Sequence, residues 1–115
     1  MQAIIEKMNG YLKMEDELEF GEFSAYYKEV MDLLQKDYQN LGKEDLVKVS
    51  AVLQIVAANA MDRSGKKDAN SKKFKKMSEK CQFWATAIEM RVRKEFGMNK
   101  QDLEAAIDEV FADAE

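Results

Sequence analysis

The chain has 115 residues, no proline, five glycines and a net charge of −4, and 46% of its residues are apolar. This size fits one domain, and the scarcity of helix-breaking residues favours an all-α fold. The absence of histidine and the presence of one cysteine exclude histidine-dependent catalysis, a Cys/His zinc site and an intramolecular disulfide. We therefore expect a protein that is not an enzyme and that carries no cofactor or metal.

Residues 1–12 have apolar side chains at helical spacing, which predicts a short N-terminal helix. This segment has no basic region followed by an apolar run, and no stretch of the chain reaches the ~18 apolar residues of a membrane span. We therefore expect a cytoplasmic protein without a signal peptide or a membrane segment. An acidic connector follows the helix and ends near Gly21.

Two longer helices are predicted next. The first covers residues 22–41, where Tyr27 is expected on the core face and Gly42 is expected to stop the helix in the left-handed conformation. The second covers residues 43–63 and is apolar around most of its circumference. Such a pattern is typical of the central helix of a bundle.

The remaining residues predict two further helices. The third, residues 71–96, is the longest and is expected to end at Gly97. The fourth begins after Asn99, a residue type that often caps a helix N-terminus. The connectors between these helices are short, which favours antiparallel packing of successive helices.

The predicted fold is all-α, a compact antiparallel helical bundle of four main helices plus a short N-terminal helix. It forms a single domain over residues 1–115. Within it, residues 1–21 supply the N-terminal helix and the acidic connector, and residues 22–112 supply the four-helix core.

Charge is distributed unevenly along the chain. Residues 63–80 carry eight basic and two acidic side chains, a net charge of +6, whereas the whole chain carries −4. The candidates for binding phosphates or an acidic partner are Arg63, Lys66, Lys67, Lys72, Lys73, Lys75, Lys76 and Lys80. Both ends of the chain are acidic, and the candidate acidic partner surface consists of Glu15, Asp16, Glu17, Glu19, Asp108, Glu109 and Asp113.

The helix predicted over residues 71–96 has two apolar faces. The core stripe includes Cys81 and Trp84, and a second stripe lies on the opposite side at the spacing i, i+4, i+7. Two interpretations remain open: other helices cover both faces, or the second stripe is a docking surface for a second copy or for another protein. Its candidate residues are Phe83, Ala87, Met90 and Lys94.

These features predict binding rather than catalysis. The first hypothesis is a small adaptor, regulator or inhibitor that docks on another protein or a ribonucleoprotein through charged helix surfaces. The second is a nucleic-acid-associated accessory subunit that contacts phosphates through residues 63–80. The third, by analogy with phage-encoded anti-defence proteins, is an acidic inhibitor that occupies a nucleic-acid-binding groove. Formation of a homo-oligomer remains open.

Overall fold

The computed structural model describes residues 1–66 and 69–112, and within them the chain forms an all-α bundle without strands. The elements in this part of the chain are α1 (Gln2–Leu12), α2 (Phe20–Asp37), a short 3-10 helix η1 (Tyr38–Asn40), α3 (Lys43–Ser64), α4 (Ser71–Phe96) and α5 (Lys100–Val110). The predicted all-α bundle is confirmed. None of the described helices has the length and apolar character needed to cross a membrane.

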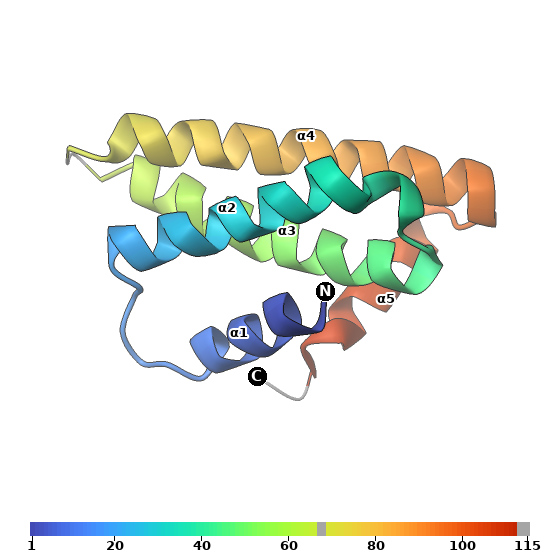
Figure 1. Ribbon diagram of the computed structural model, residues 1–115, viewed down its shortest axis with the longest axis horizontal. Coiled ribbons are helices and arrows are strands. Elements are labelled where there is room, and N and C mark those ends of the chain that lie inside the picture. The colour runs from blue at the N-terminus through green and yellow to red at the C-terminus, as the bar shows by residue number, and fades with distance from the viewer. Residues whose placement is uncertain (67–68, 113–115) are drawn as a thin grey trace.

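α4 runs along the length of the molecule. Its 26 residues correspond to ~39 Å of helix, close to the longest molecular dimension of 42 Å. Figure 1 shows α4 along one side of the bundle, α2 and α3 in the middle, and α1 and α5 on the opposite side. The most extensive helix pair is that of α3 and α4, which pack against each other along most of their length.

α3 is the central helix of the bundle, as its sequence predicts. Ten of its 22 residues are buried, because α1, α4 and α5 all pack against it. Leu46, Val49, Val52 and Leu53 have no exposed surface. These side chains fill the interior between the helices and supply much of the apolar burial that stabilises the fold.

α1 adds two buried side chains to the core, Ile4 and Met8. The hydroxyl of Tyr26 on α2 donates a hydrogen bond of 2.8 Å to the carbonyl oxygen of Ile4. Lys7 forms an exposed ion pair with Glu29, also on α2. The connector after α1 covers a cavity of about 260 Å³ between α1, α2 and α3.

Three details around α2 differ from the sequence prediction. α2 ends at Asp37 rather than at residue 41, and the chain continues as η1. Tyr26 is buried, whereas Tyr27 is only half-buried. Gly42 is not left-handed: its φ is −84°, and it is the N-cap residue of α3.

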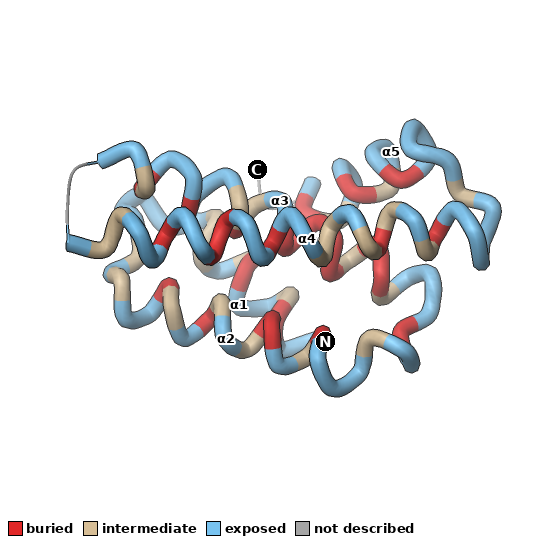
Figure 2. Tube along the Cα trace, turned by 90° about the horizontal axis from the view of Figure 1, so that it is seen from above, coloured by how far each residue is buried: buried red, intermediate tan, exposed pale blue. Residues whose placement is uncertain are grey.

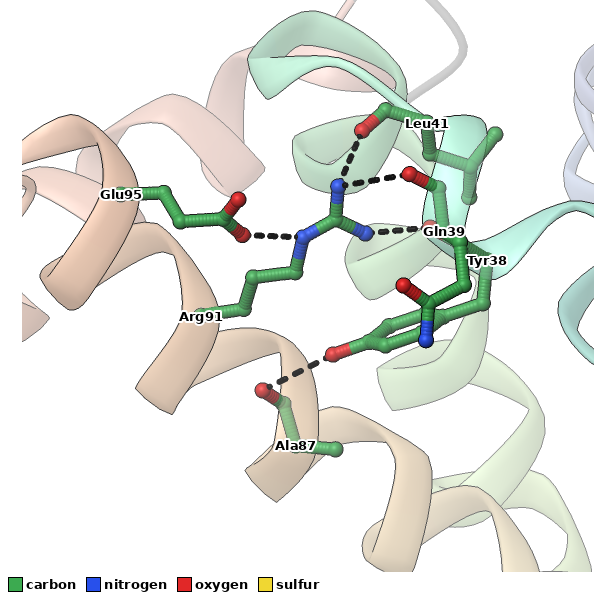
Figure 3. Close-up of polar contacts among 6 residues, drawn as sticks. All are labelled: Tyr38, Gln39, Leu41, Ala87, Arg91 and Glu95. Atoms are coloured by element: carbon green, nitrogen blue, oxygen red, sulfur yellow. Dashed lines mark hydrogen bonds and ion pairs between the residues drawn. The ribbon is translucent and has the colours of Figure 1, made fainter.

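Arg91 of α4 accounts for the early end of α2 (Figure 3). Its guanidinium donates hydrogen bonds to the carbonyl oxygens of Tyr38, Gln39 (3.3 Å) and Leu41 (2.8 Å). The hydroxyl of Tyr38 donates in return to the carbonyl oxygen of Ala87 on α4, at 3.2 Å. Because the guanidinium satisfies these carbonyl groups, the chain can leave the α-helix here and turn toward α3.

Two predicted helix ends are confirmed. Gly97 follows α4 with a φ of +64°, in the left-handed region that favours glycine. The side-chain oxygen of Asn99 accepts a hydrogen bond of 2.8 Å from the backbone N–H of Asp102 and so caps α5. These two signals are local in sequence, which explains why they could be predicted.

Candidate partner-binding surface

Lysines crowd the first half of α4. All of them are exposed, and within residues 1–66 and 69–112 none forms an ion pair. The first turn of α4 contains no acidic residue, so the lysines add to the partial positive charge of the helix N-terminus. We call this group the lysine end of α4, and it consists of Lys72, Lys73, Lys75, Lys76 and Lys80.

Arg63 was predicted to contact a partner, and the structure contradicts this prediction. Arg63 is only 6% exposed, and its guanidinium lies over two aromatic rings that also contact each other, 4.9 Å from the centroid of Phe23 and 5.3 Å from that of Phe74. It also donates a hydrogen bond to the carbonyl oxygen of Leu18 and lies 3.6 Å from a carboxylate oxygen of Glu17. Arg63 therefore anchors the acidic connector to the end of α3.

Lys66 also faces the connector, where its amino group forms an ion pair of 3.2 Å with Glu17. Both ends of this pair are about half exposed, so it contributes little to stability. Its significance is electrostatic, because the beginning of the basic segment is partly neutralised by the molecule's own acidic connector. Lys67 lies outside the described residues.

The predicted acidic partner surface consists of two separate groups. Glu15, Asp16 and Glu19 are exposed on the connector between α1 and α2, whereas Asp108 and Glu109 are exposed on α5. The connector lies at one end of the long axis, and α5 lies toward the other (Figure 1). Asp113 lies outside the described residues. The structure therefore gives no single acidic face that includes all of these side chains.

The second stripe on α4 is exposed. Phe83 is 63% exposed and Met90 is 45% exposed, while Ala87 is half-buried and Lys94 is exposed. Figure 2, which looks down on α4, shows pale blue segments recurring along the whole helix and no other element crossing over it. The interpretation that other helices cover both faces of α4 is therefore wrong. We call this surface the outer face of α4.

The outer face is shaped by a neighbouring tryptophan. The ring of Phe83 meets the indole of Trp84 edge-on, with centroids 5.6 Å apart, and Trp84 packs in turn on Tyr38. Two adjoining shallow depressions follow the helix from Glu79 to Glu95 and share Ala87 and Met90. Phe83 is thus an aromatic side chain that projects into solvent and is supported from one side.

Trp84 and Arg91 are structurally important residues of α4 that the sequence did not single out for their observed roles. Trp84 was expected in the core stripe, but it is half-buried at the seam between α4 and η1. Its indole nitrogen has no hydrogen-bond partner among the described residues. One sequence feature could have pointed to these roles: the spacing of Trp84, Ala87 and Arg91, at i, i+3 and i+7, places all three on one side of the helix.

The groups that could support covalent or metal chemistry are few. Cys81 is buried, as predicted, and burial raises the pKa of its thiol to about 12, so it is not a reactive thiolate near neutral pH. Among the described residues, no group of three or more Cys, Asp or Glu side chains is arranged to hold a metal ion.

Comparison of the chain with known protein families, with curated proteins and with solved structures finds no match.

Proposed function

We propose that this chain is a non-enzymatic binding protein that docks on an acidic surface of a partner protein or ribonucleoprotein through the lysine end of α4. The observation that carries the proposal is the set of five exposed lysines that form no ion pair in the described chain. Two of these lysines, Lys72 and Lys73, lie in the first turn of α4, where an exposed cation costs about 0.3–1 kcal/mol. An anionic partner surface would offset this cost.

The lack of histidine and the burial of the one thiol favour binding over catalysis. The sequence has no histidine, and its one thiol is buried with a raised pKa. A nucleophile or general base normally needs a pKa near the working pH and access to its substrate. The Cys81 thiol has neither property in the folded chain.

A protein partner is supported over nucleic acid by the distribution of charge. The chain carries −4 overall, so long-range electrostatics oppose the approach of a polyanion. Seven of the eight predicted cations lie in the described residues; because Arg63 is buried and Lys66 is paired, five of these seven remain exposed without an ion pair. Fewer phosphate contacts mean weaker and less salt-dependent binding.

The acidic-inhibitor hypothesis has less support than either alternative. Its candidate residues lie in two separate groups, on the connector and on α5, and Glu17 is already paired with Arg63 and Lys66. A surface that imitates a nucleic-acid backbone would need a continuous row of unpaired carboxylates.

The test compares the intact chain with two variants of equal net charge. The first replaces Lys72, Lys73, Lys75 and Lys76 with Gln, and the matched control replaces four exposed lysines on other surfaces: Lys28, Lys36, Lys43 and Lys100. We expect affinity purification from the source cells to recover the same protein with the intact chain and with the control, before and after nuclease treatment. The first variant should lose it.

Fluorescence anisotropy with labelled RNA and DNA at two salt concentrations examines the alternative partner directly. We expect no binding at physiological salt. Tight, salt-sensitive binding that the first variant loses and the control keeps would contradict a protein partner and would favour the nucleic-acid-associated subunit.

A further inference from the structure

The outer face of α4 has the same spacing of apolar and charged residues in both chain directions. Glu79, Phe83, Met90 and Lys94 follow one another at intervals of four, seven and four residues. At 100° per residue they lie within about 60° of one another around the helix. Reversing the helix exchanges Phe83 with Met90 and exchanges Glu79 with Lys94.

We propose that this face is the contact between two copies of the chain, paired antiparallel about a twofold axis that passes between Thr86 and Ala87. In this arrangement Phe83 of each copy meets Met90 of the other. Both side chains are large, apolar and exposed in the single chain, at 63% and 45%. Covering them removes apolar surface from water at two equivalent places.

Charge complementarity favours the antiparallel arrangement over a parallel one. With residues paired about this axis, Glu79 of each copy faces Lys94 of the other, which gives two ion pairs across the interface. A parallel twofold pair would instead place Glu79 against Glu79 and Lys94 against Lys94. Like charges directly opposed across an interface are unfavourable, so the same residues select one orientation.

The helix dipoles also favour the antiparallel arrangement. Because Phe96, the last residue of α4, faces Met77 of the other copy in this pairing, the segment from Ser71 to Lys76 extends past the partner's α4. Lys76 then lies near the partner's helix C-terminus, which carries partial negative charge. The rest of the lysine end extends past the partner copy, so this contact shares only Lys76 with the surface proposed above for the acidic partner.

The extent of the face indicates how strong the pairing is. From Glu79 to Lys94 the helix rises ~23 Å, which is about four turns. A single pair of four-turn helices lies at the low end of specific interface sizes, where association is weak and depends on concentration. We therefore expect a monomer–dimer equilibrium with a dissociation constant on the order of micromolar to hundreds of micromolar.

Sedimentation velocity of the full chain, from about 1 µM to about 1 mM, tests the proposal over this range. We expect the weight-average sedimentation coefficient to rise from that of a monomer to that of a dimer and to stop there. Replacing Glu79 with Lys, or Lys94 with Glu, should weaken the dimer by about 10-fold, because each change sets two like-charged pairs across the interface. The double variant E79K/K94E should recover the dissociation constant of the intact chain.

The apolar contact is tested with a matched pair of methionines. Met90 is 45% exposed on the outer face, and Met61 on α3 is 48% exposed elsewhere. M90S should weaken the dimer by about 10-fold or more, whereas M61S should leave it unchanged. Circular dichroism should show that all variants keep the helical fold, since every substituted side chain is exposed.

Three outcomes would overturn the proposal. They are a monomer at the highest concentration, equal effects of M90S and M61S, and a double charge-swap variant that dimerises no better than the single variants. The last result would mean that Glu79 and Lys94 do not face each other, even if the chain does dimerise.

Discussion

The guanidinium of Arg91 lies over the ring of Tyr38, 4.9 Å from its centroid, and the same side chain donates a hydrogen bond to the Tyr38 carbonyl oxygen. The two residues are 53 positions apart in sequence. One side chain of α4 thus ends α2, positions η1 and holds the chain as it turns into α3 (Figure 3). The α2–α3 connection therefore depends on α4 being in place.

Replacing Arg91 with Ala should lower the free energy of unfolding by about 2–3 kcal/mol, because three backbone carbonyl groups lose a charged donor. Arg93 is the matched control: it is exposed, and its side chain forms no hydrogen bond or ion pair with a described residue. R93A should change the stability by less than about 0.5 kcal/mol. Urea denaturation followed by circular dichroism measures both, and similar values for the two variants would contradict the role of Arg91.

Replacing Arg63 with Ala should cost about 3 kcal/mol, because the contacts with the Phe23 and Phe74 rings and the hydrogen bond to Leu18 are lost together. Lys66 provides the comparison, because its replacement with Ala removes only an exposed ion pair with Glu17. K66A should cost less than about 1 kcal/mol. If the two variants have equal melting curves, the buried guanidinium does not anchor the connector.

The lysine end of α4 should lower the stability of the folded chain. Replacing Lys72 with Gln should raise the free energy of unfolding slightly, and replacing it with Glu should raise it further, by about 0.5–1 kcal/mol in total. The reason is that a carboxylate in the first turn interacts favourably with the helix N-terminus and with Lys76 one turn later. Denaturation at low and high salt measures the series, in which the gain should shrink as salt is added.

Alkaline pH should destabilise the fold through Cys81. Burial raises the pKa of its thiol from an ordinary 9.0 to about 12, so the folded state holds this proton where the unfolded state releases it. The contribution is present below pH 9 and is lost as pH rises from about 9 to about 12, with a slope of up to about 1.4 kcal/mol per pH unit. Denaturation midpoints measured over this range for the intact chain and for C81A give the slope.

The C81A comparison separates the thiol from other groups that titrate at high pH, such as Tyr26, whose pKa is also raised by burial. The variant should start less stable, because it loses buried volume, and should then decline less steeply. Parallel declines for the two proteins would show that the thiol does not set the slope.

The sequence predicted every main helix because apolar periodicity is a local property that tertiary contacts rarely reverse. It also located Gly97 and Asn99, since a left-handed glycine and a capping side chain act within a few residues of themselves. It misplaced the end of α2 because that end is fixed by Arg91, which is distant in sequence. No local pattern near Tyr38 contains this information.

The candidate surfaces show the same difference between local and long-range information. The charge run identified the lysine end of α4, and helical spacing identified Phe83 and Met90. The burial of Arg63 could not be foreseen, because its two aromatic neighbours come from α2 and α4 and meet only in the folded chain. Exposure of the outer face was likewise undecided in sequence, since it depends on where α1 and α5 pack.

The modest attachment of α1 has a consequence for how the molecule moves. α1 and its connector are held on the bundle by two buried side chains, the ring contact of Tyr11 with Tyr26, two hydrogen bonds, from Tyr26 to Ile4 and from Arg63 to Leu18, and the ion pairs of Lys7 and Glu17. By contrast, α3 is surrounded by other helices. Segments of this kind open by local unfolding at a free energy well below that of the whole domain. The amide protons of residues 1–19 should therefore exchange with solvent deuterium while those of α3 remain protected. When the segment returns to the bundle, Arg63 binds Leu18 and Glu17 again.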